Sequence, residues 1–357
     1  MHTDPTPAEL RELRHAVDDA LARALDRILP RLVGLHPVLA PLADELAAFT
    51  ASGKRIRPAL LLLGYAAGGG RRHSEAMGPA LALELLHTCA LVHDDVIDRA
   101  ESRRGRPSVH RRFTDAHRDA RHAGDARTYG DAIGILLGDL AFVYADELFL
   151  DADVAPPQLL AGFRRFTELR EEVMAGQVLD LHAAASRSVG RDLALTVATL
   201  KSGRYSVTRP LQVGAALAGA DTPLIDALQA FGDPLGRAFQ VRDDLLGVFG
   251  DPRTTGKSVS SDLVEGKRTL LVAEAAERLD AAERRELLDG LGDAALTEAG
   301  AVRLRELIEA SGARSAAERY VADAVSEAVT ALDGLSVDTD VDAALRAVAR
   351  YLGARSR

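Results

Sequence analysis

The sequence of 357 residues is poor in cysteine, aromatic residues and lysine. Its one cysteine, Cys89, excludes a disulfide framework and a multi-cysteine metal site, and it fits a reducing cytoplasm. Aromatic residues make up 4% and include no tryptophan, so aromatic cages for cations and stacking platforms for bases are poorly supplied. The formal charge of −9 argues against nucleic acid or an anionic membrane as the main partner.

Long apolar segments are also missing. The longest apolar run, 59–67, is too short to span a bilayer, so we expect no integral membrane segment. The first ten residues lack a basic segment followed by an apolar one, so we expect no signal peptide and a cytoplasmic protein.

Lysine is so rare that each one is informative. Only four of the 44 basic residues are lysine, namely Lys54, Lys201, Lys257 and Lys267. In a chain that uses arginine almost everywhere, a lysine indicates a site that favours a compact point charge. All four lie in short motifs with glycine, aspartate or hydroxyl residues, which is typical of a binding site.

Apolar residues recur at helical spacing along nearly the whole chain, and no run alternates with a period of two. We therefore predict an all-α fold in a single domain, 1–357, whose first 30 or so residues form a peripheral helix. The predicted helices cover 10–29, 58–67, 76–97, 132–150, 159–181, 192–200, 224–231, 238–249, 270–288, 301–311, 316–335 and 341–352. Pro210 and Pro234 are predicted to kink or break helices.

Two pairs of aspartates end apolar helical segments. Asp94 and Asp98 are four residues apart and share one helix face, whereas Asp95 is turned by roughly 100° from Asp94. Asp243 and Asp244 end a second segment of the same kind. Carboxylates at the end of a buried helix need a cation, and Mg²⁺ takes oxygen ligands from one or two carboxylates, water and phosphate. Two such ends facing one cavity would hold several cations around a diphosphate.

Basic residues that match an anion lie nearby in the sequence. Lys54 and Arg57 stand at the entry of a predicted helix, where backbone N–H groups and the helix dipole favour negative charge. Arg103 and Arg104 follow Asp94 by nine and ten residues, and arginine forks bind phosphate oxygens in pairs.

Together these motifs resemble those of the trans-isoprenyl diphosphate synthases, the polyprenyl synthetase family. They are GKRIRP at 53–58, DDVID at 94–98, RRGRP at 103–107, GQVLDL at 176–181, KSG at 201–203, FQVRDDLLG at 239–247 and GKRT at 266–269. The resemblance implies the isoprenoid synthase fold, in which a bundle of helices surrounds a central cavity. It also implies a magnesium-dependent prenyltransferase that joins isopentenyl diphosphate to an allylic diphosphate, and a homodimer.

The resemblance also implies a role for each motif residue. Three magnesium ions are expected on Asp94, Asp95, Asp98, Asp243 and Asp244. The allylic diphosphate is expected on Arg103, Lys201 and Lys257, bordered by Lys267. Isopentenyl diphosphate is expected on Lys54, Arg57, His87 and Arg104. The reacting centre is expected to be lined by Gln177, Asp180, Ser202 and Gln240, and the catalytic set comprises Asp94, Asp98, Arg103, Lys201, Gln240 and Asp243.

One position departs from the family pattern. The family often has a third aspartate in the second motif, where this chain has Gly247. Its contribution is therefore missing or is supplied by Asp251 or Asp262.

The length of the product depends on residues one turn before the first aspartate motif. Cys89 and Ala90 are small and leave room for a long tail, and we interpret Cys89 as an apolar core residue rather than a nucleophile. The next candidate for the floor of the tail cavity is Leu86, with Phe142 or Met174 from neighbouring helices. The prediction is a product longer than C15, with C20 geranylgeranyl diphosphate favoured.

Alternative functions remain open at this point. A class I terpene cyclase on the same fold would use the same magnesium chemistry, although cyclases favour aromatic faces that this chain lacks. A synthase of longer or shorter products, or a catalytically silent subunit of a heteromeric synthase, would share the motifs. A helical scaffold would explain neither the aspartates nor the lysines.

Overall fold

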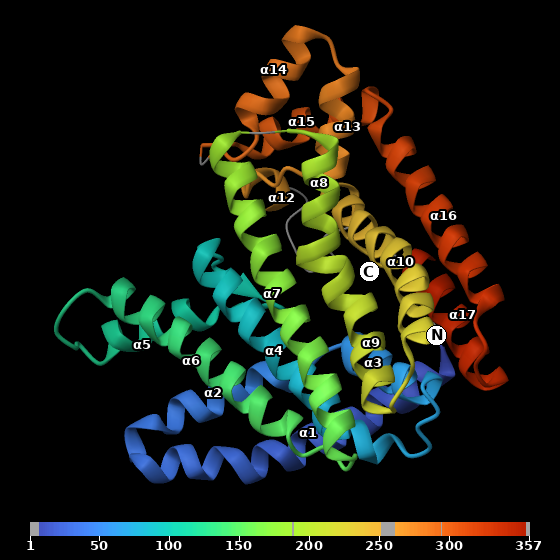
Figure 1. The fold of residues 1–357 in the computed structure, drawn as a ribbon. Coiled ribbons are helices and arrows are strands. Elements are labelled where there is room, and N and C mark those ends of the chain that lie inside the picture. Colours follow the sequence, from blue (N-terminus) through green and yellow to red (C-terminus); the bar gives the residue numbers. More distant parts are fainter. Residues whose placement is uncertain (1–6, 188, 251–260, 294, 355–357) are drawn as a thin grey trace. The chain divides into compact units, whose positions relative to one another are not determined.

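The computed structural model describes residues 7–187, 189–250, 261–293 and 295–354 (Figure 1). The chain forms two compact units. The N-terminal unit contains Ala8–Leu62 and Arg71–Leu159, and the C-terminal unit contains Leu63–Gly70 and Leu160–Arg357. That the whole chain acts as one domain stays a prediction.

The elements of the chain up to residue 186 are almost all helical. In chain order they are α1 (Ala8–Leu35), η1 (Pro37–Leu39), α2 (Ala40–Thr50), α3 (Ile56–Ala67), η2 (His73–Ala76), α4 (Met77–Ile97), β1 (Ser102–Arg103), β2 (Arg106–Pro107), α5 (Val109–Asp119), α6 (Ala126–Phe149) and α7 (Pro156–Ser186). The strands form one short antiparallel hairpin, in which Ser102 pairs with Pro107 and Arg103 with Arg106.

Helices also make up the rest of the described chain. They are α8 (Arg191–Val197), the π-helix η3 (Ala198–Thr208), α9 (Arg209–Leu217), α10 (Thr222–Phe249), α12 (Ser261–Val264), α13 (Leu270–Arg278), α14 (Ala281–Gly290), α15 (Glu298–Ala310), α16 (Ala313–Ala331), η4 (Leu332–Gly334) and α17 (Thr339–Ala354). The prediction of an all-α fold is confirmed.

The core of the N-terminal unit is built on α4. This helix packs against α6, and α5 packs against α6 in turn (Figure 1). Leu83, Leu85 and Val92 of α4 are completely buried. The stretch His73–Ile97 is long and apolar enough to cross a membrane, but 67% of its apolar window is buried inside the protein, as in the core helix of a globular domain.

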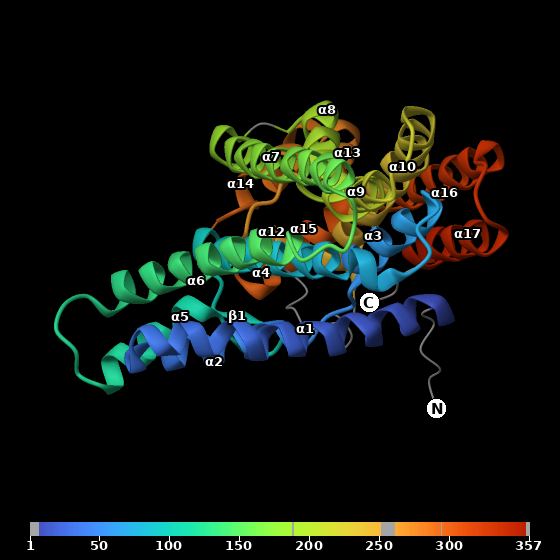
Figure 2. The same ribbon diagram turned by 60° about the horizontal axis from the view of Figure 1, so that its bottom comes forward.

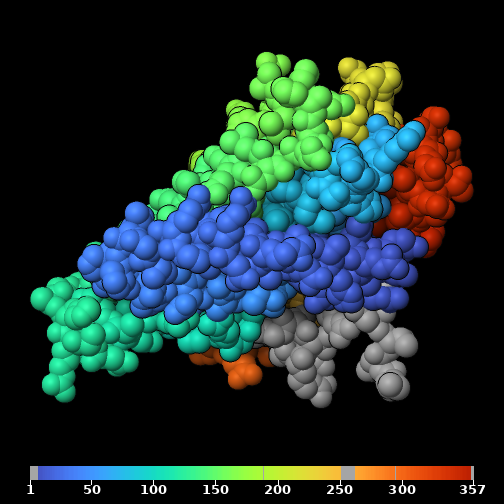
Figure 3. All heavy atoms as spheres, turned by 90° about the horizontal axis from the view of Figure 1, so that it is seen from below, coloured from blue at the N-terminus to red at the C-terminus, as the bar shows by residue number. Residues whose placement is uncertain are grey.

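Helix α1 covers the core of the same unit with one face. Its buried residues recur every three or four positions, among them Leu10, Leu13, Val17 and Leu21. This spacing is that of an amphipathic helix, and the opposite face meets solvent. Helix α1 runs beside α2 (Figure 2), and the outer surface of both is blue in Figure 3.

The core of the C-terminal unit is built on α10. This helix packs against α16 and against η3 (Figure 1). A Cβ atom at Gly203 of η3 would lie 2.9 Å from the backbone carbon of Gly236 in α10, so both helices need glycine at this contact. The contact fixes η3, which carries Lys201 and Ser202, directly against α10.

Several predictions of helix boundaries are wrong. Pro234 does not break its helix, because α10 runs unbroken from Thr222 to Phe249. The helix predicted over 270–288 is two helices, because the Asp280 side chain accepts hydrogen bonds from the backbone N–H groups of Ala282 and Glu283 and starts α14. Helices α2, α5, α9 and α12 and the π-helical geometry of η3 were not predicted.

Candidate active site

The first aspartate motif forms the last turn of α4, in the N-terminal unit. Asp94 is half-buried, Asp95 is completely buried, and Asp98 is the exposed C-cap residue. The carbonyl groups at a helix C-terminus already carry partial negative charge, so three carboxylates there need positive partners. The geometry therefore favours cations at the exposed side of this turn.

Asp95 has a cation of its own within the protein. Its Oδ1 accepts hydrogen bonds from Arg103 Nε at 2.9 Å and from Nη2 at 2.5 Å, whereas its Oδ2 is buried without a hydrogen-bond partner. Burial raises the pKa of Asp95, while Arg103 opposes that rise. The pair directs Asp95 inward and holds the β1–β2 hairpin against the end of α4.

The turn of that hairpin presents Arg104. Arg104 and Gly105 both have positive φ angles, 53° and 75°, which is the geometry of a type I′ hairpin turn. Arg104 donates hydrogen bonds to the carbonyl oxygen of Ser52 and, at 3.4 Å, to that of Phe49. The hairpin is thereby attached to the segment that leads into GKRIRP.

His87 lies two turns before Asp94 and is surrounded by positive charge. Burial lowers its pKa well below the usual value, and Arg57, Arg104, Arg103 and Arg55 lower it further. The imidazole is therefore neutral at neutral pH. The structure thus brings together Arg57, His87, Arg103 and Arg104, and Lys54 is exposed on the loop just before α3, whose first turn carries Arg57. Such a cluster suits an anion with several oxygen atoms, such as a diphosphate.

Of the residues predicted to limit product length, Leu86, Cys89 and Ala90 lie on α4 and Phe142 lies on α6, which packs against α4. Leu86 and Cys89 are buried, and Ala90 and Phe142 are half-buried, whereas Met174, in the C-terminal unit, is 53% exposed. Burial raises the pKa of the Cys89 thiol to about 12, so the thiol stays protonated, as expected for an apolar core residue.

The second aspartate motif lies near the end of α10, in the C-terminal unit. Asp243 is exposed, whereas Asp244 is buried and its Oδ1 accepts a hydrogen bond from Gln240 Nε2 at 2.7 Å. Both motifs therefore share one pattern, in which the first aspartate reaches the surface and the second is buried with a donor from the protein.

Lys201 and its neighbours form a second group in the C-terminal unit. Lys201 Nζ lies 2.6 Å from Asp180 Oδ2 on α7. A Cβ atom at Gly176 would lie 2.3 Å from the backbone nitrogen of Lys201, so η3 and α7 contact through their backbones. Gln177 and Ser202 are half-buried on the same two elements. Long π-helical segments are rare and often occur at functional sites.

Asp262 occupies the place of the missing third aspartate. A Cβ atom at Gly247 would lie 1.9 Å from Asp262 Oδ2. Asp262 Oδ1 accepts a hydrogen bond from Lys267 Nζ at 2.9 Å, and Lys267 also pairs with Glu265 at 2.6 Å. Asp262 therefore lies where it can supply the missing carboxylate. Asp251, like Lys257, lies outside the described residues.

The carboxylates fit magnesium in kind. Asp94 and Asp98 offer oxygen donors from one helix face, and Mg²⁺ typically takes only one or two protein carboxylates beside water and phosphate. Within the ranges that the structure describes, no three His, Cys, Asp or Glu side chains already converge on one point. This donor set suits an ion that arrives with a phosphate ligand.

Sequence reasoning missed the residues that support the site. Arg55, Asp18 and Glu84 form a buried ion-pair network beside the GKRIRP loop. Glu84 had a visible signal, since it is a carboxylate inside the apolar run of α4. Asp18 had no such signal in the sequence, because nothing local distinguishes it from the other charged residues of α1.

Comparison with known proteins agrees with the motifs. The family model described as "Polyprenyl synthetase" matches residues 40–308. The chain belongs to the polyprenyl synthetase family. It is accordingly a prenyltransferase of the trans-prenyl diphosphate synthase class.

Its relatives carry names for different product lengths. The chain is 34% identical over 303 residues to a (2E,6E)-farnesyl diphosphate synthase of Mycobacterium tuberculosis, covering 84% of this chain and 79% of the relative. It is 35% identical over 272 residues to a geranylfarnesyl diphosphate synthase of Aeropyrum pernix, covering 75% and 79%. Family membership therefore leaves the product length open.

A solved structure resembles the fold over nearly its whole length. It is a geranylgeranyl pyrophosphate synthase of Corynebacterium glutamicum, in complex with isoprenyl diphosphate and magnesium. It superposes with a TM-score of 0.90 at 33% identity, covering 97% of this chain and 99% of that one.

The pKa of Asp244 gives a testable pH dependence. Burial raises this pKa from 3.8 to about 8, and Asp262 adds to the rise. Between these values the folded protein holds a proton that the unfolded chain has lost. The stability of the metal-free protein should therefore fall as pH rises, by up to about 1.4 kcal/mol per pH unit. In EDTA, Asp244→Asn should flatten the fall of Tm between pH 6 and pH 8, whereas Asp243→Asn should not. Equal slopes in wild type and Asp244→Asn would contradict the raised pKa.

The contact at Gly247 predicts the sign of a glycine substitution. Gly247→Ala should destabilise the protein by about 1–3 kcal/mol in urea unfolding, because the new methyl group displaces a carboxylate that Lys267 holds. Gly34→Ala in α1 is the matched control, since a Cβ atom there meets nothing within 4 Å. It should stabilise its helix by up to about 1 kcal/mol. A Gly247→Ala variant as stable as Gly34→Ala would show that Asp262 does not occupy this space.

Proposed function

We propose that the protein elongates an allylic diphosphate by one or more units of isopentenyl diphosphate and that its main product is the C20 geranylgeranyl diphosphate. The observation that carries the proposal is the pairing, on one helix, of an acidic end at Asp94 and Asp98 with a basic cluster around His87 two turns earlier. One substrate diphosphate needs cations on carboxylates, which α4 supplies, and the other needs arginine and lysine, which the start of α3 and the β1–β2 hairpin supply around His87 of α4.

The two aspartate motifs are proposed to act on the same allylic diphosphate. Asp94, Asp98 and Asp243 would hold three magnesium ions, with Asp95, Asp244 and Asp262 behind them. When bound, these ions would supply the positive charge that a leaving diphosphate needs. Arg103, Lys201, Lys257 and Lys267 would bind the same diphosphate directly.

The basic cluster is proposed to hold isopentenyl diphosphate. Lys54, Arg57 and Arg104 would bind its oxygen atoms, and His87 would donate a hydrogen bond as a neutral imidazole. The N-terminus of α3 directs backbone N–H groups toward the same anion. These groups fix the position of the double bond that attacks.

The reaction breaks the allylic C–O bond and forms a C–C bond between the two prenyl groups. Diphosphate leaves with the bonding electron pair, the double bond of isopentenyl diphosphate attacks the allylic carbon, and a proton is lost to an oxygen of the departing diphosphate. Gln240 and Ser202 would turn their oxygen dipoles toward the positive carbon, and Gln177 and Asp180 would complete that wall. Exclusion of water from this space prevents quenching to an alcohol.

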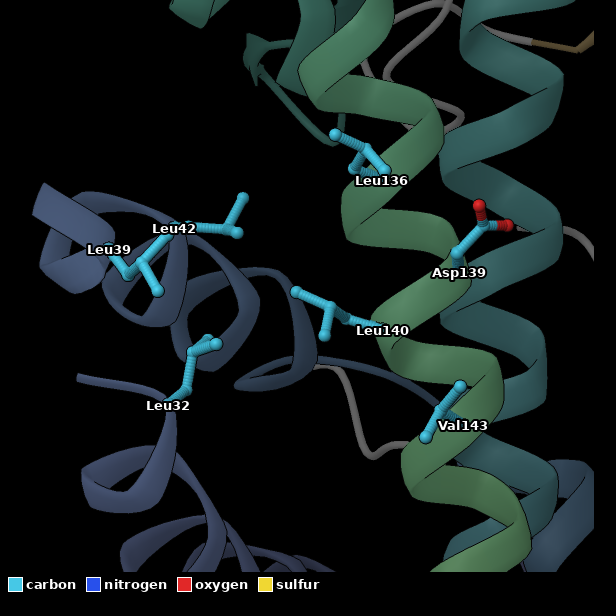
Figure 4. Close-up of a pocket in the computed structure, with 7 residues that line it drawn as sticks. All are labelled: Leu32, Leu39, Leu42, Leu136, Asp139, Leu140 and Val143. Atoms are coloured by element: carbon cyan, nitrogen blue, oxygen red, sulfur yellow. The ribbon is translucent and has the colours of Figure 1, made fainter. Parts of the chain in front are cut away.

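The proposal includes a homodimer. Helix α6 exposes Leu136 and Val143, at 54% and 59%, beside an apolar groove of about 310 Å³ (Figure 4). The groove is lined by Leu32, Leu39, Leu42, Leu136, Asp139, Leu140 and Val143. Exposed apolar surface of this kind supports a second copy of the chain as the partner. We also propose that the protein is cytoplasmic.

The function is tested by direct synthesis. The purified protein is incubated with isopentenyl diphosphate, Mg²⁺ and, separately, dimethylallyl, geranyl and farnesyl diphosphates, and the products are sized. We expect C20 from each primer, and no activity in EDTA. Consumption of isopentenyl diphosphate separates this function from a terpene cyclase. No product with any primer would contradict it and would favour a silent subunit.

Product length should respond to the proposed floor. Leu86→Ala and Phe142→Ala should each shift the products beyond C20, because one helical turn of about 5 Å corresponds to one isoprene unit. Leu81 is another buried leucine of α4, so Leu81→Ala is the control for loss of packing. A leucine-to-alanine change in a core typically lowers the free energy of unfolding by about 2–5 kcal/mol. Unchanged products in both variants would show that neither residue forms the floor.

A further inference from the structure

Arg55 belongs to the GKRIRP segment, in which Lys54 and Arg57 are proposed to bind substrate, but its own side chain is buried in the protein. It lies between Lys54, which is exposed, and Arg57, yet it is itself only 3% exposed. Its φ angle is 51°, in the left-handed region that residues with a side chain rarely adopt. Such a conformation costs about 1–3 kcal/mol and persists only where surrounding contacts enforce it.

Hydrogen bonds to three helices hold Arg55 in this left-handed conformation. Arg55 Nε donates to Asp18 Oδ1 of α1 at 2.7 Å, Nη1 donates to Glu84 Oε1 of α4 at 2.5 Å, and Nη2 donates to the Thr50 carbonyl at the end of α2 at 2.5 Å. Burial alone would lower the pKa of Arg55, but Glu84 and Asp18 raise it above its ordinary value. The guanidinium is therefore a permanently charged junction between α1, α2 and α4.

The same residue sets where α3 begins. The Arg55 carbonyl accepts a hydrogen bond from the Ala59 N–H at 3.0 Å, so Arg55 is the N-cap residue of α3. Gly53 makes the arrangement possible, since a Cβ atom there would lie 2.8 Å from Arg55 Nη1. The junction thus fixes the path of the chain on both sides of Lys54 and the first turn of α3, which carries Arg57.

We propose that Arg55, Asp18 and Glu84 form a clamp that positions Lys54 and Arg57 for the diphosphate of isopentenyl diphosphate. Asp18 makes α1 part of this clamp, although α1 lies outside residues 40–308, which the family model matches. The residues of the clamp are positioning residues rather than substrate ligands. This inference rests on the proposed function, because it assigns Lys54 and Arg57 to that substrate.

The sharpest test is Asp18→Asn, because the side chain of Asp18 is 35% exposed and its loss should leave the fold intact. The Michaelis constant for isopentenyl diphosphate should rise about 10-fold, the effect of losing one charge-assisted hydrogen bond. The Michaelis constant for the allylic diphosphate and kcat at saturation should stay near wild type. Arg55→Lys, which cannot reach all three acceptors, should shift the same constant further in the same direction.

A matched control removes the other ion pair of the same carboxylate. Arg14 Nε lies 3.7 Å from Asp18 Oδ2, and the Arg14 side chain makes no hydrogen bond to Asp18, so Arg14→Gln should leave all three constants unchanged. Hydrogen exchange of the backbone amides at 53–57 gives a readout without catalysis. Exchange there should be faster in Asp18→Asn and unchanged in Arg14→Gln.

The outcomes separate the clamp from the proposed function. Lower Tm in Asp18→Asn and Arg55→Lys, with unchanged Michaelis constants and unchanged exchange at 53–57, would show a purely structural role and overturn the clamp. An equal rise in the constants for both substrates would also overturn it. A wild-type protein that elongates no primer would contradict the proposed function, whereas faster exchange at 53–57 in Asp18→Asn would still support the clamp.

Discussion

The structure depends on carboxylates placed where a helix least favours them. The last turn of α4 carries paired aspartates next to carbonyl groups that are already partly negative, and α10 carries a second pair about a turn and a half before its end. In each pair the inner member accepts a hydrogen bond from a side chain of the protein, Asp95 from Arg103 and Asp244 from Gln240. The outer members, Asp94 and Asp243, reach the surface. The inner members thus lie inside the protein, and the outer members lie where an ion from solvent can reach them.

The basic residues of the site are positioned by attachments within the protein. Burial lowers the pKa of His87 well below its usual value, four nearby arginines lower this pKa further, and Glu84 lies one turn away on the same helix. Like charges at this density repel each other, so the loops that carry them need rigid attachments. The hairpin turn at Arg104 and the buried junction at Arg55 provide these attachments. His87, at the centre of the basic cluster, is thereby kept two helical turns before Asp94 on α4.

The sequence could predict elements and residue types better than side-chain directions. The helix predicted over 76–97 is observed as Met77–Ile97, because a long apolar run with one clear end defines it. The inward turn of Asp95 beside the half-exposed Asp94 depends on Arg103, and the replacement of a third aspartate by Asp262 depends on a contact across 15 residues. The left-handed Arg55 and the π-helix η3 arise from packing against other elements, which no local pattern encodes.

The contrast between arginine and lysine, visible in composition, has a structural counterpart. The arginines of the site are bound at several atoms: Arg55 to three acceptors, and Arg103 through two nitrogens to Asp95. Lys201 and Lys267 instead contact carboxylates, Asp180, Asp262 and Glu265, through a single ammonium group. A planar fork loses several hydrogen bonds when it moves, whereas an ammonium group on a flexible stem can exchange one oxygen partner for another at little cost. A synthase that binds and releases diphosphate in each cycle can use both kinds of cation, with a multiply bound arginine such as Arg55 in the fixed frame and lysines among the contacts that change.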